Sequence, residues 1–143
     1  QRQMCIRDRL KLTLTSPQGN VKHEVIVPNL VVTAGKNFIA DRLKNNTTVM
    51  SHMAIGTGST AAAAGNTALG SEAGRVALTS STVTDNAVAY VGSFAAGTGT
   101  GAITEAGLLN ASSNGTLLCR TVFSVINKGA NDTLGITWTV TIS

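Results

Sequence analysis

Glu105 is the residue whose chemistry most restricts the environment that it can occupy. It is an acid inside an otherwise apolar run that extends from Ile103 to Gly107. A buried carboxylate in such a run costs free energy unless it is paired or hydrogen-bonded. Arg75 and Arg120 are the available cationic partners. Because buried acids are usually paired, we interpret Glu105 as half of a structural ion pair rather than as a binding or catalytic group.

The other reactive side chains form no catalytic or metal-binding pattern. His23 and His52 are far apart in the sequence, and no acidic residues accompany them at metal-ligand spacing. Neither histidine belongs to a recognisable triad with a serine or cysteine. Cys119 stands alone in a strand-like run, where a cysteine usually packs as a small apolar residue. We therefore expect no enzyme activity, no cofactor, and no catalytic or metal-binding residues.

A glycine-rich run, Gly56 to Asn66, follows an apolar strand and has a superficial likeness to a dinucleotide-binding loop. The helix and the downstream acid that such a loop requires are missing from the pattern. We therefore predict a long, mobile surface loop, followed by a short helical turn within Thr67 to Ala73. Glu72 and Arg75 lie three residues apart and can form a local ion pair.

The final run of the chain has the clearest strand period. Leu134, Ile136, Trp138, Val140 and Ile142 share one face, and threonines occupy the other. This alternation predicts that Trp138 is a core anchor, and a buried indole N–H then needs an acceptor.

The whole segment from Gly101 onward is predicted to be a three-stranded antiparallel meander. Its turns are expected at Asn114-Gly115, which is a strong hairpin signal, and at Asn127 to Asp132.

The remaining elements complete a mainly β prediction. Alternating apolar residues indicate a hairpin over Leu10 to Val27, and helical spacing indicates one short α-helix from Ala34 to Lys44, capped by Thr33. Further strands are expected at Met50 to Ile55, Arg75 to Thr79, and Val83 to Phe94 with a turn at Asp85-Asn86. About eight strands and one helix predict an antiparallel β-sandwich or a jelly-roll-like fold.

The first nine residues, Gln1 to Arg9, show neither strand alternation nor a helical stripe. The segment resembles the translated adapter read-through that prefixes some metagenomic reading frames, and an ordinary frayed terminus is the alternative. We therefore predict a non-structural tail, 1–9, before a single β-sandwich domain, 10–143.

Charge and composition restrict the partners that we expect. Charged residues make up 13% of the 143, and the formal net charge is +4. No cluster of basic residues with interleaved aromatics appears, so no nucleic-acid partner is expected. No apolar run approaches the roughly 20 residues of a membrane helix, so no membrane partner is expected either. Two cysteines, Cys5 and Cys119, favour a reducing cytoplasmic folding compartment over a disulfide framework.

Three stretches of the sequence together resemble small structural proteins of tailed bacteriophages, of the tail-fibre and collar-fibre type. The first joins Met53-Ala54-Ile55-Gly56-Thr57-Gly58 to Thr67-Ala68-Leu69-Gly70-Ser71-Glu72 and Arg75, and the second runs from Ile103 to Ala111. The third joins Gly115 to Phe123 with Asn127-Lys128 and Thr137 to Val140. The resemblance implies a non-catalytic assembly module of the tail or tail fibre. It also implies a homo-oligomer, with a trimer favoured, that is made in the host cytoplasm and joins other proteins in the virion.

Two further interpretations stay open from the sequence. A capsid decoration (cement) protein would share the oligomeric, low-charge character. A host-surface carbohydrate-binding module would bind a glycan, and it would need exposed aromatic side chains. The sequence has few aromatic residues, 3% of the chain, and most lie on predicted core faces, so the carbohydrate interpretation ranks third.

Overall fold

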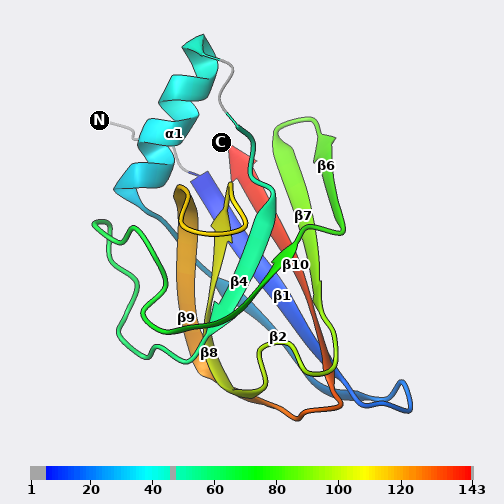
Figure 1. Cartoon of the computed structure of the whole chain (residues 1–143). Helices are drawn as coiled ribbons and strands as arrows, with labels where there is room; N and C mark the ends of the chain where they lie inside the picture. The colour runs from blue at the N-terminus through cyan, green and yellow to red at the C-terminus, as the bar shows by residue number, and fades with distance from the viewer. Residues whose placement is uncertain (1–5, 46–47, 143) are drawn as a thin grey trace.

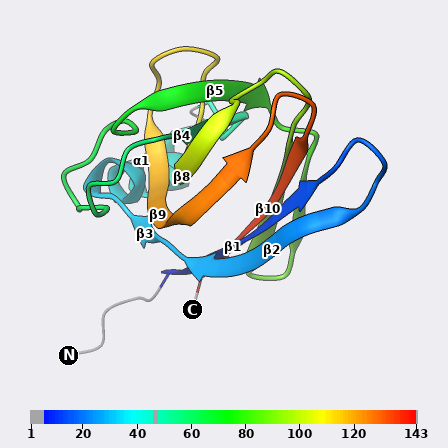
Figure 2. The same cartoon turned by 90° about the horizontal axis from the view of Figure 1, so that it is seen from below.

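The chain folds into two antiparallel sheets that face each other, and a helix lies at one end (Figures 1 and 2). The computed structural model describes residues 6–45 and 48–142. Sheet A has the strand order β2 (Val21–Pro28), β1 (Ile6–Thr15), β10 (Thr133–Ile142), β7 (Ala87–Phe94), β6 (Ser80–Thr84). Sheet B has the order β3 (Leu30–Val31), β9 (Leu117–Lys128), β8 (Gly101–Leu109), β4 (His52–Gly56), β5 (Glu72–Ala77). The mainly β, sandwich-type prediction is therefore confirmed.

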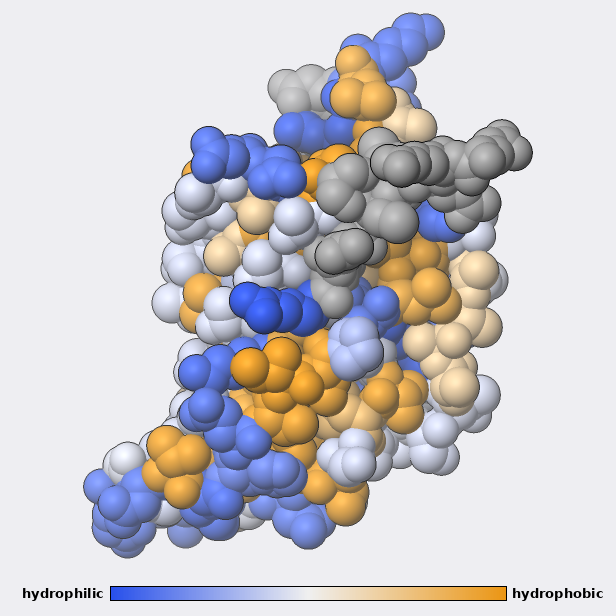
Figure 3. Space-filling view, turned by 180° about the vertical axis from the view of Figure 1, so that it is seen from behind, coloured by the Kyte–Doolittle hydropathy of each residue, from blue (hydrophilic) through white to orange (hydrophobic). Residues whose placement is uncertain are grey.

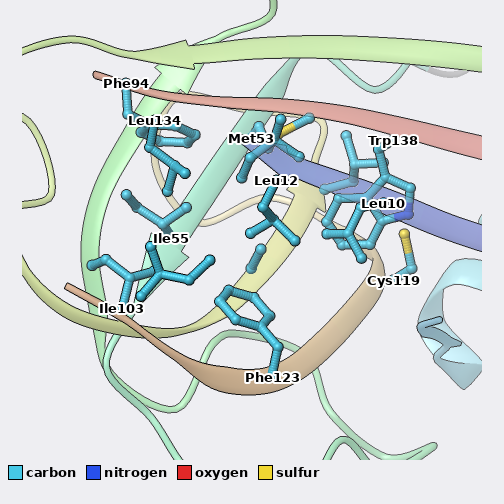
Figure 4. Packing of buried hydrophobic residues seen from close by; sticks show 14 of the residues in the cluster. Leu10, Leu12, Met53, Ile55, Phe94, Ile103, Cys119, Phe123, Leu134 and Trp138 are labelled. Carbon is cyan, nitrogen blue, oxygen red and sulfur yellow. The ribbon is translucent and has the colours of Figure 1, made fainter. Parts of the chain in front are cut away.

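The core lies between the sheets and follows the alternation of the strands. Leu10 pairs across the ladder with Trp138, and both side chains are fully buried (Figure 4). From sheet B, Met53, Ile55 and Phe123 pack into the same cluster. The predicted core face of β10 is therefore correct from Leu134 to Val140, with Trp138 at 0% exposure, whereas Ile142 at the end of the strand is 41% exposed.

The tight turns lie where the sequence predicted them. Asp85 has φ 53° in the two-residue turn between β6 and β7. Asn114 and Gly115 have φ values of 52° and 79° in the loop between β8 and β9. Aspartate, asparagine and glycine tolerate this left-handed backbone better than other residues, so these turns are encoded locally.

The predicted three-stranded meander is wrong at its last step. β8 and β9 form a hairpin in sheet B, but β10 crosses to sheet A and lies between β1 and β7. The period of two correctly identified the buried face of β10, but it carries no information about which strands are its neighbours.

The start of the domain also differs from the prediction. β1 begins at Ile6, inside the segment 1–9 that was predicted to be a non-structural tail. In this segment β1 pairs with β10 from Ile6↔Ile142 to Arg9↔Thr139. Backbone hydrogen bonds to the long strand β10 therefore extend β1, although the sequence of the segment does not alternate between apolar and polar residues. The other five residues of the predicted tail lie outside the described residues.

The helix α1 (Thr33–Lys44) matches the predicted helix but not its cap. Val32 occupies the N-cap position, and no side chain of the described residues caps the helix there. The N–H of Thr33 donates instead to the carbonyl oxygen of Ala64 at 2.8 Å. The predicted helical turn over residues 67–73 is also wrong, because that stretch is irregular up to the start of β5 at Glu72.

Candidate functional site

Glu105 lies at the centre of a buried polar cluster whose hydrogen bonds join residues up to 60 positions apart in the sequence. β8 carries it between Gly56 of β4 and Val122 of β9, and its side chain is fully buried. Its carboxylate accepts three backbone N–H groups from loop 57–71, which connects β4 to β5. Gly58 donates to Oε1 at 2.9 Å, Ser71 to Oε1 at 2.7 Å, and Gly70 to Oε2 at 2.9 Å.

Arg120 of β9 completes this cluster from the neighbouring strand. Its Nε and Nη2 lie 2.9 and 2.8 Å from Oε2 of Glu105, so of the two predicted partners Arg120 forms the ion pair. Nη1 donates to Oδ1 of Asn66 at 3.0 Å, and Nη2 donates to the carbonyl oxygen of Thr60 at 3.0 Å. The guanidinium is 2% exposed, and its planar set of donors connects β8 to two points of loop 57–71.

Glycines make room for the carboxylate. A Cβ at Gly56 or Gly58 would lie 2.6 or 2.5 Å from Oε1 of Glu105, well inside contact distance. A Cβ at Gly107 would lie 2.8 Å from Cδ2 of Leu69, which covers β8 from the loop. These glycines are needed for close approach rather than for unusual backbone angles.

The hydrogen bonds determine the charge state of Glu105. Burial by itself raises the pKa of a carboxyl group, because it disfavours the ionised form. The N–H groups of Ser71 and Gly70, the Arg120 side chain and the N–H of Gly58 outweigh that effect and lower the pKa of Glu105 below 4.5. The ionised carboxylate is therefore the form that the fold selects.

Arg75, the other predicted partner of Glu105, serves a separate connection. Its Nη2 lies 2.7 Å from Oε1 of Glu72, which is the local pair that the sequence spacing indicated. Its Nη1 donates to the carbonyl oxygens of Ala111 and Asn114, both at 2.9 Å. Arg75 therefore ties β5 to the loop between β8 and β9.

A second buried polar cluster, at the opposite end of β9, was missed by the sequence analysis. Asp132 accepts from Nζ of Lys22 at 2.7 Å and from the N–H of Gly129 at 2.8 Å. The hydrogen bond from Lys22 is the main reason that the pKa of Asp132 is lowered. Lys128 is 1% exposed, and its Nζ donates to the carbonyl oxygen of Ala95 at 3.0 Å. Burial lowers the pKa of Lys128.

This second cluster had little signal in the sequence. Lys128 and Asp132 lie in a polar turn segment, where charged residues are normally solvated. The one indication in the sequence was the three-residue spacing of Gly129 and Asp132. At this spacing an aspartate can accept a hydrogen bond from the backbone N–H of the residue three positions before it.

Trp138 is buried as predicted, but its expected acceptor is missing. Among the described residues, the indole N–H has no hydrogen-bond partner. Trp138 therefore contributes to the core through packing alone.

The histidines do not come together. His23 is exposed on β2 in sheet A, whereas His52 is half-buried on β4 in sheet B, with Nδ1 2.8 Å from Oγ of Ser51. The described residues contain no group of three metal-ligating side chains. Nor does the described part of the chain include a helix that is long and apolar enough to cross a membrane.

Two hollows of about 330 Å³ adjoin the Glu105–Arg120 pair. One lies within loop 57–71, along its residues 65–70, and the other lies between Pro28–Leu30 and Ala61-Ala62. Arg120 lines both, but its nitrogens are already bonded to Glu105, Asn66 and Thr60.

Comparisons with protein-family models, with curated proteins and with solved structures found no match to this chain.

Proposed function

We propose that this chain is a non-catalytic structural module of a tailed-bacteriophage particle, associated with the tail or its fibres. One observation carries the proposal: residues from each of the three stretches behind the phage resemblance meet at one place in the fold. Gly56 and Gly58 come from the first stretch, Glu105 from the second and Arg120 from the third. These parts of the motifs therefore form one internal connection, whereas Thr137 to Val140 lies on β10 in sheet A.

The chemistry of that connection supports a structural role. A catalytic carboxylate needs access to substrate and a lone pair or proton to exchange. Glu105 is fully buried, and its two oxygens accept three backbone N–H groups and Arg120. All three N–H donors belong to loop 57–71, so the cluster is suited to holding that loop in place.

The outer surfaces support assembly with other protein. On the outer face of sheet A, Thr137 and Thr139 of β10 lie opposite Val91 and Ala89 of β7, so β10 and β7 form an uncharged strip there. On the other side of β10 the same threonines lie opposite Lys11 and Arg9 of β1, so a basic strip borders the uncharged one. Hydrophobic surface also gathers into a patch on the face seen in Figure 3. The exposed large hydrophobic residues include Val21 and Ile26 of β2, at 59% and 58% exposure. Such apolar surface favours contacts with other proteins.

The carbohydrate-binding alternative has less support. Sugar rings stack on exposed aromatic side chains, and none of the described aromatics is exposed. Trp138, Phe94 and Phe123 are buried, and Phe38 and Tyr90 are partly buried against the core. A capsid decoration protein remains the second candidate, because the exposed apolar residues are equally suited to binding a shell.

Labelling of intact particles tests the proposal. Antibodies raised against the full chain should bind the tail or fibres of the encoding phage in electron micrographs, and its peptides should be found in purified particles by mass spectrometry. Labelling of the capsid would favour the decoration role instead. Absence of the chain from purified particles, together with its presence in infected cells, would contradict both structural roles.

A further inference from the structure

The four sheet edges of the described structure are not equally protected. An edge strand exposes unpaired N–H and C=O groups, and natural sheets block pairing there with charges, proline, bulges or very short strands. β2 carries Lys22 and Glu24 and ends at Pro28. β5 carries Glu72 and Arg75, and its register against β4 shifts near one end. β3 has two residues, and β9, which extends beyond it, has a register shift against β8.

β6 has none of these protective features. Its sequence, Ser80-Ser81-Thr82-Val83-Thr84, contains no charge and no proline, and all five residues are exposed. Its register with β7 is unbroken over the five pairs. Val83 is 70% exposed, and β7 is its only strand neighbour among the described residues. Figure 1 shows the β6–β7 hairpin at the flank of the molecule, on the side opposite β9.

The turn that follows β6 determines which of its residues direct their backbone N–H and C=O groups away from β7. Thr84 and Ala87 flank the two-residue turn, so they form a hydrogen-bonded pair, and Thr82 also directs its backbone groups to β7. Ser81 and Val83 then direct theirs outward. The hairpin tip is anchored, because Nδ2 of Asn86 donates to the carbonyl oxygen of Ile142 at 2.7 Å and Asn86 accepts the N–H of Ile142 at 2.9 Å.

We propose that β6 pairs antiparallel with β6 of a second copy of this chain, about a two-fold axis at Thr82. Ser81 of each copy then exchanges backbone hydrogen bonds with Val83 of the other, and the two Thr82 side chains face each other. A two-fold contact sets each residue near the axis against its own counterpart or a close neighbour. Because β6 is uncharged, its self-pairing brings no like charges together, so a second copy is a suitable occupant.

This inference rests on the proposed assembly function and names one of its contact surfaces. A two-fold contact joins copies in pairs, whether the pair is the whole assembly or a link between larger rings. It joins sheet A of the two copies into one continuous ten-stranded sheet, since each copy contributes five strands.

Charge introduced at the axis tests the contact. Thr82→Lys places two cations directly opposite each other, and we expect the dissociation constant of the full-chain dimer to rise about 10-fold or more by sedimentation velocity. Ser93→Lys is the matched control, because Ser93 is also an exposed strand residue but lies on β7, two residues beyond the last β7 residue that pairs with β6. Its dissociation constant should be unchanged.

Cross-linking provides a second test, which detects the contact directly and does not depend on weakening the dimer. Facing residues of a non-hydrogen-bonded antiparallel pair have Cα atoms about 4.5 Å apart, which a disulfide can span. In a Cys5→Ser background, where Cys119 is buried, Thr82→Cys should form a disulfide-linked dimer and Ser93→Cys should not. An oligomer that Thr82→Lys leaves intact and Thr82→Cys does not link would overturn this contact alone. A chain that stays monomeric and unlinked would overturn the contact and self-assembly together, and particle labelling would still test the structural role.

Discussion

At the scale of single residues, the structure depends on an ion pair that is buried and fully hydrogen-bonded. Removing one partner of such a pair leaves the other charge buried and unpaired, which costs more than the pair itself contributes. Glu105 and Arg120 are 0% and 2% exposed, so solvent cannot replace the lost contacts. The sequence identified Glu105 because an acid in an apolar run has few tolerable environments. It could not choose between Arg75 and Arg120, because the register of β8 against β9 decides which arginine lies within reach.

The substitution Glu105→Ala should therefore destabilise the protein strongly. We expect a loss of about 3–5 kcal/mol in the free energy of unfolding, measured by urea denaturation. Glu72→Ala removes an acid from a more exposed ion pair and should cost about 1 kcal/mol or less. Equal losses for the two variants would mean that Glu105 is not specially important to the fold.

The lowered pKa of Glu105 predicts acid sensitivity. The unfolded chain binds more protons than the folded chain between the folded pKa and 4.5, so stability falls as the pH falls through this window. Above pH 4.5 the contribution is fully present. Glu105→Gln removes this titration, so its unfolding free energy should depend less steeply on pH below 4.5 than that of the unmodified chain. Identical pH slopes would contradict the assignment.

At the scale of elements, loop 57–71 is the segment whose contacts the sequence could not predict. Its small residues have no periodicity and suggested a mobile loop. The contacts that organise it come from Glu105, 47 positions after Gly58 and 34 after Ser71. Local composition does not carry contacts of this kind, whereas the hairpins and the helix depend on neighbours in sequence and were predicted.

Two glycines of this loop provide a matched test of its organisation. A Cβ at Gly58 would overlap the carboxylate of Glu105 at 2.5 Å, whereas a Cβ at Gly65 would meet no atom within 4 Å. Gly58→Ala should therefore lower the unfolding free energy by about 1–3 kcal/mol and make the loop susceptible to limited proteolysis. Gly65→Ala should leave both measurements close to those of the unmodified chain. Similar behaviour of the two variants would show that the carboxylate does not constrain the loop.

At the scale of the whole molecule, the sequence predicted the layers better than the connections between them. Alternation in β1 and β10 identified the buried faces, including Trp138, because period two follows directly from strand geometry. The crossing of β10 from sheet B to sheet A was not predictable from that period. The burial of Lys128 was not predictable either. It depends on the loop after β7, in which the carbonyl oxygen of Ala95 accepts a hydrogen bond from Nζ of Lys128 at the end of β9.

Amide hydrogen exchange tests most directly the claim that Glu105 and Arg120 hold loop 57–71 as a structural connection. In the unmodified full chain, the N–H groups of Gly58, Gly70 and Ser71 should exchange slowly, because each donates to the Glu105 carboxylate. In Glu105→Gln these amides should exchange much faster, while those of the β1–β10 ladder stay protected. Rapid exchange of the three loop amides in the unmodified chain would contradict the account.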